Sequence, residues 1–135
     1  MSTIRTLILD AASQCPDNVA LRWKSDGKWC VWTFADLLSK ARNIAEAAAS
    51  LGVKPGDHVA MMMENRPEWI TTYLGLASCG ITVVPIDANL LEREVSHILR
   101  DSESVAFFGS GKTWTLLHAI GTSDIKLDSL KSSVM

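Results

Sequence analysis

The sequence predicts an α/β protein with an open, mainly parallel sheet, flanking helices and a β-hairpin before them. Three apolar runs predict the sheet, at residues 58–63, 81–85 and 104–108. They lack the alternation of a half-exposed strand, which is typical of parallel strands covered on both faces. Segments with helical periodicity separate the runs, and each is long enough to return the chain for parallel pairing by a right-handed crossover.

Length, composition and charge narrow the class of protein. The 135 residues suffice for one domain, and the shares of hydrophobic residues (47%) and charged residues (21%) are those of an ordinary globular protein. The net charge is −2 and no cluster of Lys or Arg occurs, so no nucleic-acid partner is predicted. The longest uninterrupted apolar stretch is Val59–Met63, far below the ~20 residues that span a bilayer, so no transmembrane segment is predicted.

The cysteines and histidines suggest a reducing compartment and no metal site. The three cysteines form an odd set without metal-ligand spacing, and the three histidines lie far apart in the sequence. Leu7–Leu9, the apolar run near the N-terminus, is too short for a secretory signal. We therefore expect a cytoplasmic protein with reduced thiols. The residues concerned are Cys15, Cys30, Cys79, His58, His97 and His118.

The first quarter of the chain is expected to form a short helix and a hairpin. A helix over residues 3–13 places four apolar side chains on one face, and turn residues at 15–18 end it. Residues 19–24 and 28–33 flank Asp26-Gly27, a dipeptide typical of a two-residue hairpin turn. The four apolar residues of the helix are Ile4, Leu7, Ile8 and Ala11.

The clearest element is a helix over residues 34–51. Thr33 and Asp36 have the spacing of a capping box, and Gly52 follows where a C-terminal glycine is favoured. Between them, apolar residues recur at helical spacing, so one face is expected to enter a core. They are Phe34, Leu37, Leu38, Ala41, Ile44, Ala45, Ala48 and Leu51.

Three more helices are expected between and after the apolar runs. Pro67 is placed at the first position of one, which ends at Gly80. Asn89 is expected to cap the next helix. A last helix is expected over residues 113–120, and the chain beyond Gly121 is polar. The predicted buried stripe of the first of these helices is Ile70, Tyr73, Leu74 and Ala77, and that of the second is Leu91, Val95, Ile98 and Leu99.

Polar residues at the strand ends are the candidate site. Ligands of open α/β sheets bind beyond the carboxyl ends of the strands, here Glu64-Asn65, Ile86-Asp87-Ala88 and Gly109-Ser110-Gly111. The residues expected to face a cleft are Asn65, Asp87 and Asn89. The alternative is that they only form turns and helix caps, positions that Asn and Asp favour.

One segment is similar to a phosphate loop. Residues 106–113 end in Gly-Lys-Thr between a predicted strand and a predicted helix, so Gly109–Thr113 could bind a nucleotide. However, Ala106 stands where the pattern requires Gly. Phe107 and Phe108 also occupy positions where bare backbone must wrap around phosphate. We therefore favour the interpretation that the segment is a strand end, a glycine-rich turn and a helix start.

Three blocks, in order and at suitable spacing, carry a family resemblance. The first is residues 32–37, an aromatic-Thr-aromatic entry to a long helix, and the second is residues 52–60 with its continuation Glu64-Asn65-Arg66-Pro67-Glu68-Trp69. The third is residues 75–87, with Ser78-Cys79 where the family has Lys and Ala. Together they resemble the beginning of the AMP-forming acyl-activating enzymes, the superfamily of acyl-CoA synthetases, firefly luciferase and peptide-synthetase adenylation domains.

The resemblance covers residues 3–108 and is greatest to acyl-CoA and long-chain fatty-acid CoA ligases. It implies that residues 1–108 form the N-terminal subregion of an AMP-binding domain, followed by a divergent helical and polar tail over 109–135. It also implies an enzyme that uses ATP and Mg²⁺ to join a carboxylic acid, such as a fatty acid, to AMP and then passes the acyl group to CoA. Peripheral association with a membrane is compatible with this family.

The segments that carry the family's chemistry do not occur in this sequence. They are the Ser/Thr/Gly-rich phosphate loop ending in Pro-Lys-Gly, the ribose-binding Asp, and the C-terminal domain with its catalytic Lys. We therefore assign no catalytic residue, and we expect the chain to be an incomplete portion of the larger fold that is inactive alone. A non-catalytic module that binds a partner is the main alternative. An incomplete sheet also predicts self-association through exposed apolar surface.

Overall fold

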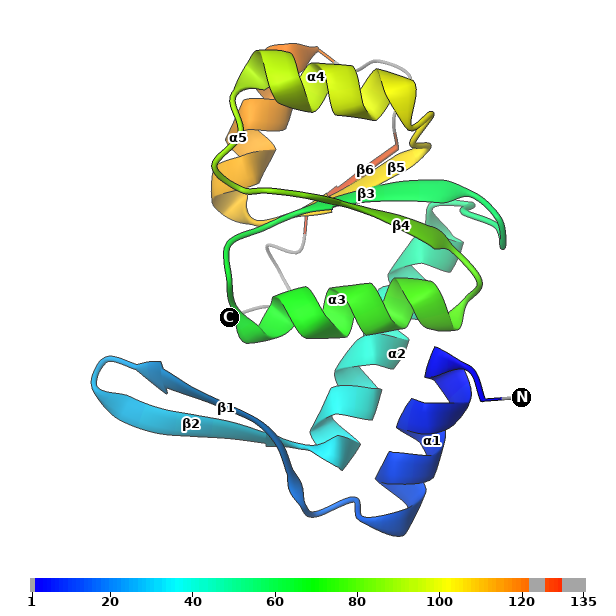
Figure 1. The fold of residues 1–135 in the computed structure, drawn as a ribbon, viewed down its shortest axis with the longest axis vertical. Coiled ribbons are helices and arrows are strands. Elements are labelled where there is room, and N and C mark those ends of the chain that lie inside the picture. The colour runs from blue at the N-terminus through cyan, green and yellow to red at the C-terminus, as the bar shows by residue number, and fades with distance from the viewer. Residues whose placement is uncertain (1, 122–125, 130–135) are drawn as a thin grey trace.

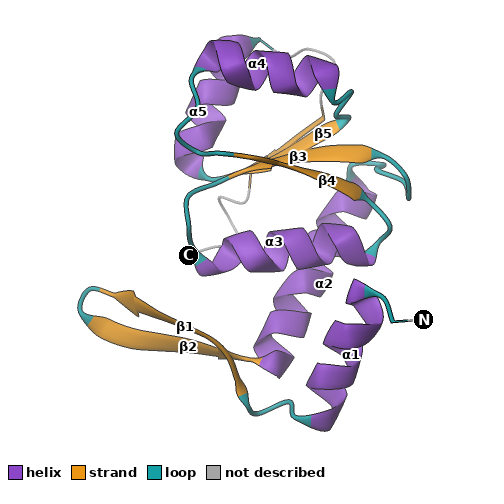
Figure 2. Cartoon of the chain, viewed as in Figure 1, coloured by secondary structure: helices purple, strands orange, loops and turns teal. Residues whose placement is uncertain are grey.

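The computed structural model of the chain describes residues 2–121 and 126–129. Its helices alternate with strands after an N-terminal helix and hairpin (Figures 1 and 2). The elements are α1 (Ile4–Gln14), β1 (Val19–Ser25), β2 (Lys28–Thr33), α2 (Phe34–Ser50), β3 (His58–Met62), α3 (Pro67–Ser78), β4 (Thr82–Ile86), α4 (Glu92–Asp101), β5 (Ala106–Gly109), α5 (Gly111–Ile120) and β6 (Lys126–Ser129).

Four parallel strands form the main sheet, in the order β4-β3-β5-β6. The predicted fold class is confirmed, since β3, β4 and β5 lie within a residue or two of the three apolar runs. The strand β6 was not predicted, because its segment lacks an apolar run. β6 pairs in parallel with β5, from Ala106↔Lys126 to Gly109↔Ser129. The main sheet therefore includes a strand from residues 109–135, the segment that was expected to be a divergent tail.

Helices cover both faces of the sheet. Along β3, Val59 and Met61 pack toward α2 and α3, whereas Ala60 and Met62 pack toward α4 and α5 (Figure 1). All four side chains are almost completely buried. The apolar run is continuous because helices cover this strand on both faces, as the sequence pattern predicted.

The hairpin and the start of α2 follow local sequence signals. Asp26 and Gly27 both have positive φ, 49° and 75°, as a type I′ turn requires. The backbone N–H of Thr33 donates to the Asp36 carboxylate at 2.9 Å, and the backbone N–H of Asp36 donates to the Thr33 hydroxyl at 3.2 Å. The predicted hairpin and capping box are both confirmed.

The predicted buried stripe of α3 is wrong. The buried residues of this helix are Thr71, Thr72, Gly75 and Leu76, and the predicted residues are only half-buried. The reason is that α3 packs against both the sheet and α2, and small residues allow the two helices to approach. A Cβ on Gly75 would lie 2.5 Å from the carbonyl oxygen of Ala41.

The predicted cap of α4 is also wrong. Leu91 is the N-terminal cap residue, and its backbone N–H donates to the Glu94 carboxylate at 3.0 Å. Asn89 lies two residues earlier, in the turn that follows β4. The side chain of Glu94, in the first turn of the helix, therefore satisfies the N–H of the cap residue.

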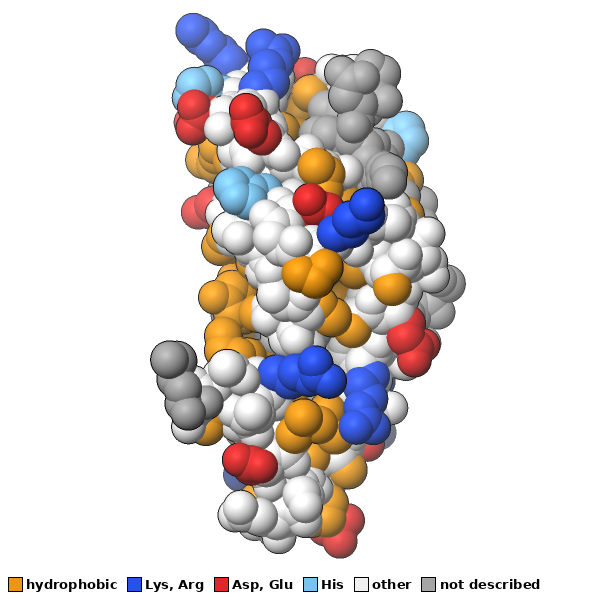
Figure 3. All heavy atoms as spheres, turned by 90° about the vertical axis from the view of Figure 1, so that its right-hand side faces the viewer, with side chains coloured by type: hydrophobic (Ala, Val, Ile, Leu, Met, Phe, Trp, Pro, Cys, Tyr) orange, Lys and Arg blue, Asp and Glu red, His pale blue; other side chains and the backbone are white. Residues whose placement is uncertain are grey.

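The surface of the described residues has two distinct sides. On the side turned away from the hairpin, basic and acidic side chains are interspersed with apolar ones (Figure 3). On the opposite side the hairpin projects from the body below α3 (Figure 1). No helix in the described part of the chain combines the length and the apolarity needed to cross a bilayer.

Candidate functional site

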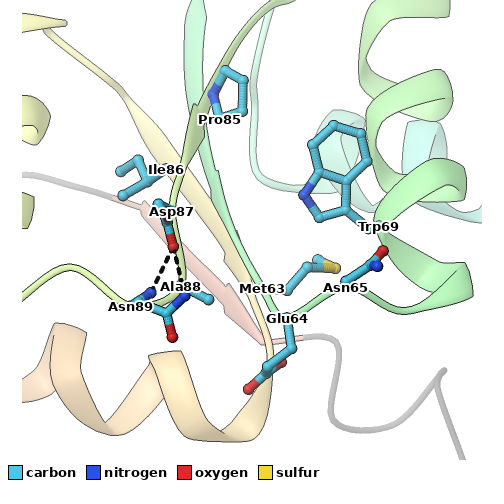
Figure 4. A pocket seen from close by; sticks show the side chains of 9 residues that line it. All are labelled: Met63, Glu64, Asn65, Trp69, Pro85, Ile86, Asp87, Ala88 and Asn89. Carbon is cyan, nitrogen blue, oxygen red and sulfur yellow. Dashed lines mark hydrogen bonds between the residues drawn. The ribbon is translucent and has the colours of Figure 1, made fainter.

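A pocket of about 580 Å³ lies at the carboxyl ends of β3 and β4 (Figure 4). The parallel register, which places Met62 beside Ile86, brings the two strand ends to the same edge of the sheet. The first turn of α3 supplies a third wall. The lining residues are Met63, Glu64, Asn65, Trp69, Pro85, Ile86, Asp87, Ala88 and Asn89.

The structure brings all three sequence-predicted candidates to this pocket. Asp87 and Asn89 form a closed local turn, in which Oδ1 of Asp87 accepts from the backbone N–H of Asn89 at 2.9 Å and from its Nδ2 at 3.0 Å. This is the turn role that Asp and Asn favour. Asn65 lies across the pocket, after β3, with an exposed side chain.

Trp69, which was not among the predicted site residues, forms the apolar wall of the pocket. The Trp69 ring stacks on Tyr73 with the ring centroids 5.5 Å apart and the planes 5° from parallel. Met63 and Pro85 also line the pocket, and Met63 is 4% exposed. A stacked pair holds the indole in one orientation, so this wall is preformed.

Glu64 lies where the strand order changes direction. From β3 the chain continues through α3 on one face of the sheet, and from the adjacent β5 it continues through α5 on the other face. Such a switch point is where open α/β sheets bind ligands. Here the Ser110 hydroxyl at the end of β5 donates to Oε1 of Glu64 at 2.9 Å, and Oε2 is buried with no hydrogen-bond partner among the described residues.

The surroundings of Glu64 favour its charged form. Burial by itself would raise the pKa of Glu64, but hydrogen bonds from its own backbone N–H and from Ser110 lower the pKa. The positive charges of Arg66 and Lys112 lower it further, and the net pKa lies below the ordinary range. Glu64 is therefore a fixed negative charge at neutral pH, beside the positive end of the α5 dipole.

Internal hydrogen bonds use the hydroxyl groups of Ser110 and Thr113, just before and at the end of the Gly111-Lys112-Thr113 segment. Ser110 alone connects β5 to α5 and caps the helix, and its hydroxyl is engaged by Glu64. The Thr113 hydroxyl donates to the carbonyl oxygen of Met62 at 2.7 Å. A Cβ on Gly109 would lie 2.5 Å from that hydroxyl, so close packing explains this glycine.

The pocket does not fit a triphosphate with its metal ion. Its lining includes two carboxylates, Glu64 and Asp87, and no Lys or Arg. A phosphate chain would meet these two negative charges, and the nearest cations, Arg66 and Lys112, do not line the pocket. Within residues 2–121 and 126–129, no group of three or more His, Cys, Asp or Glu side chains is arranged to hold a metal. The pocket instead suits a neutral or cationic group that stacks on Trp69.

The contact that joins Glu64 to Ser110 spans 46 positions in the sequence. It depends on β5 lying beside β3, which no local pattern determines. The one local pattern that could have pointed to Ser110 is the Ser110-x-x-Thr113 spacing, which is typical of a helix cap. Trp69 was visible as a residue of the family-like block, but its stacking partner Tyr73 had been assigned to a buried stripe.

Comparisons of the sequence with a family profile and with curated proteins indicate the same family. The sequence profile of the family described as AMP-binding enzyme matches residues 8–133. Long-chain fatty acid transport protein 1 of Rattus norvegicus is 33% identical over 110 residues, which are 82% of this chain and 17% of that protein. Crotonobetaine/carnitine–CoA ligase of Salmonella arizonae is 36% identical over 118 residues, which are 87% of this chain and 23% of that protein.

Solved structures agree with the fold. The N-terminal domain of FACL13 from Mycobacterium tuberculosis superposes with a TM-score of 0.86 and 27% identity, over 98% of this chain and 35% of that one. A fatty acyl CoA synthetase of the same organism gives a TM-score of 0.82 and 26% identity, over 94% of this chain and 26% of that one. The chain spans about a fifth of the length of these curated relatives. Because the profile covers nearly all of the sequence and relatives exceed 30% identity over most of it, the chain belongs to the AMP-binding enzyme family.

Proposed function

We propose that this chain supplies the N-terminal layers of an ATP-dependent acyl-CoA synthetase. Such an enzyme joins a carboxylic acid to AMP with release of pyrophosphate and then transfers the acyl group to CoA, with Mg²⁺ on the phosphates. The observation that carries the proposal is the family match over residues 8–133, on a fold shared with acyl-CoA synthetases. A fatty acid is the proposed substrate class, in keeping with the names of two of the relatives.

In this proposal the chain contributes scaffold, and the remainder of the enzyme contributes chemistry. The acidic lining of the Trp69 pocket supports this division, since it offers no cation to a triphosphate. The family-like phosphate loop and catalytic Lys are also not among the 135 residues. We therefore expect no adenylation by this chain alone. We propose a cytoplasmic location for the enzyme, with peripheral attachment to membranes compatible with its substrate class.

A nucleotide-binding role for Gly109–Thr113 is the weaker candidate. A phosphate loop cradles its ligand with several free backbone N–H groups, whereas here a single residue connects strand to helix and its hydroxyl is already bonded to Glu64. Calorimetric titration with Mg·ATP tests this candidate directly. We expect no heat of binding for the wild type; heat that disappears in Lys112→Ala would establish the site.

The ligase proposal is tested by an activity measurement on two polypeptides. The 135-residue chain is incubated with ATP, Mg²⁺, a fatty acid and CoA, and pyrophosphate release is followed. The second polypeptide is the product of the same transcript read past Met135. We expect turnover only in the longer product. Turnover by the 135-residue chain would contradict the scaffold role, and a transcript without a Ser/Thr/Gly-rich loop would contradict the ligase assignment.

A further inference from the structure

The outer edge of β1 borders a groove of about 720 Å³. Five consecutive residues of this strand, Leu21–Ser25, form one wall together with Cys30 of β2. The other wall comes from residues 65–68 and Ile70, at the start of α3. Figure 1 shows β1 on the side of the hairpin that faces α3. Among the described strands, β1 pairs only with β2, so its second edge is free along the whole groove.

The backbone of this edge has unused hydrogen-bonding groups. Ser25 and Lys28 flank the two-residue turn and form the first hydrogen-bonded pair, so Trp23 and Cys30 form the next one. Arg22 and Lys24 lie at the alternating positions, where N–H and C=O point away from the partner strand. In β1 these groups point toward the groove, and they are spaced as a further strand requires.

The side chains along the edge divide into two kinds. Leu21 and Trp23 are half-buried on the face of the hairpin nearer the body, whereas Arg22 and Lys24 are exposed on the other face. There they lie over the Trp29 ring, 4.5 Å and 5.2 Å from its centroid. A strand added to β1 would therefore meet apolar side chains on one face and two cations on the other.

The charged side chains that line the groove are mainly positive. Three cations line it, Arg22, Lys24 and Arg66, against one carboxylate, Glu68. Glu68 is already paired with Arg66 at 2.7 Å. This contrasts with the interspersed charges on the side of the molecule shown in Figure 3. The uncompensated cations are Arg22 and Lys24, which flank the middle of the free edge.

We propose that this groove binds an extended peptide segment with alternating apolar and acidic residues, which pairs with β1 as an additional strand. Backbone hydrogen bonds to Arg22 and Lys24 supply the pairing, and acidic side chains opposite these residues supply the selectivity. The apolar side chains of the peptide pack against Trp23 and Ile70. The proposal does not depend on the ligase assignment.

A second copy of this chain is a poor occupant of the same edge. Antiparallel pairing of two β1 strands about Trp23 would place Arg22 of each copy opposite Lys24 of the other. Like charges directly across a strand pair are destabilising. The cations therefore favour an acidic partner and disfavour pairing of this strand with itself.

The test uses a seven-residue probe, the length of β1. It is the acetylated and amidated peptide Thr-Glu-Val-Glu-Val-Glu-Thr, titrated into the ¹⁵N-labelled chain at low concentration. We expect saturable shifts confined to β1 and the start of α3, and slower hydrogen exchange of the Arg22 and Lys24 N–H groups. Two matched peptides serve as controls, one with Lys in place of every Glu and one with N-methyl groups along one backbone edge. We expect neither control peptide to bind.

Variants of the protein locate the interaction. Arg22→Glu and Lys24→Glu should each weaken binding by up to about fivefold, the upper end of the range of a cross-strand charge pair. Lys28→Glu makes the same charge change outside the groove and should leave binding unchanged. Equal binding of the Lys peptide or the N-methylated peptide, or shifts without protection of the two N–H groups, would overturn the proposal. So would protection that grows with protein concentration in the absence of peptide, because β1 would then pair with a second copy.

Discussion

At the scale of single residues, Glu64 joins two strands that are distant in sequence. Its carboxylate accepts the Ser110 hydroxyl and lies near Arg66 and Lys112, and these contacts hold its pKa below the ordinary value of a Glu side chain. A depressed folded-state pKa gives a stabilisation that is present above the unfolded-state pKa and is lost as the pH falls through the folded-state pKa.

Glu64→Gln tests this contribution, because the amide keeps an oxygen for Ser110 but removes the charge. We expect the variant to have a lower free energy of unfolding than the wild type at pH 7, and the difference to shrink below about pH 4. Urea denaturation at several pH values measures it. Glu46→Gln, at an exposed position of α2, is the control. A difference between wild type and Glu64→Gln that does not change with pH would show that the charge is not involved.

Gly75 lies at a close contact between α2 and α3. A Cβ there would lie 2.5 Å from the Ala41 carbonyl oxygen and 2.7 Å from Cβ of Ile44. Gly75→Ala should therefore lower the free energy of unfolding by about 1–3 kcal/mol, the cost of overpacking, although Ala favours helix by about 1 kcal/mol. Denaturant unfolding measures the loss. Ala77→Gly, on the same helix, measures the cost of replacing Ala by Gly in α3. A Gly75→Ala chain that is more stable than the wild type would show that α2 leaves room for a Cβ at this position.

At the scale of elements, the junction of β2 and α2 depends on one reciprocal cap. Thr33→Ala removes the acceptor of the Asp36 N–H and should cost about 1 kcal/mol of unfolding free energy. Thr33→Ser keeps the hydroxyl and should lose much less. Thermal or urea unfolding followed by circular dichroism compares the two. If Ala and Ser variants unfold alike, the cap contributes nothing and packing alone holds the junction.

Elements with local signals were predictable, and elements defined by their neighbours were not. The type I′ turn at Asp26-Gly27 and the cap at Thr33 follow from side chains within a few positions of each other. The buried face of α3 does not, because α2 decides which side of the helix carries Gly75. The strand β6 was missed for a similar reason, since its pairing with β5 is a property of the sheet.

The candidate site, too, could be predicted from the sequence only in part. Parallel strands end at one edge, so the convergence of Asn65 and Asp87 on one pocket could be predicted from the order of elements. The contact of Glu64 with Ser110 could not, because it requires the strand order β4-β3-β5. The free edge of β1 was equally hidden, since the sequence predicts a hairpin but not the groove beside it.

At the scale of the whole molecule, several large apolar side chains are exposed among the described residues. They lie on separate elements, the outer face of α1, the hairpin and the turn before α4. The exposed fractions are 59% for Leu7, 58% for Trp29, 48% for Val31 and 71% for Leu91. The main sheet also has β4 at one edge, where Pro85 interrupts the donors that a new strand could use. Self-association is therefore expected through side-chain surfaces such as α1 and not through this edge.

Leu7 provides the sharpest test of that expectation. The purified 14.7 kDa chain should elute from size exclusion above its monomer mass, increasingly so with concentration, and should bind a hydrophobic dye. Leu7→Lys should reduce both signals without changing the circular dichroism spectrum, since this side chain is exposed. Ile8→Lys, one position along the same helix but buried, should instead unfold α1 and increase dye binding. A wild-type chain that is monomeric, binds no dye and melts sharply would show that these surfaces need no partner, because scattered exposed apolar residues alone do not drive association.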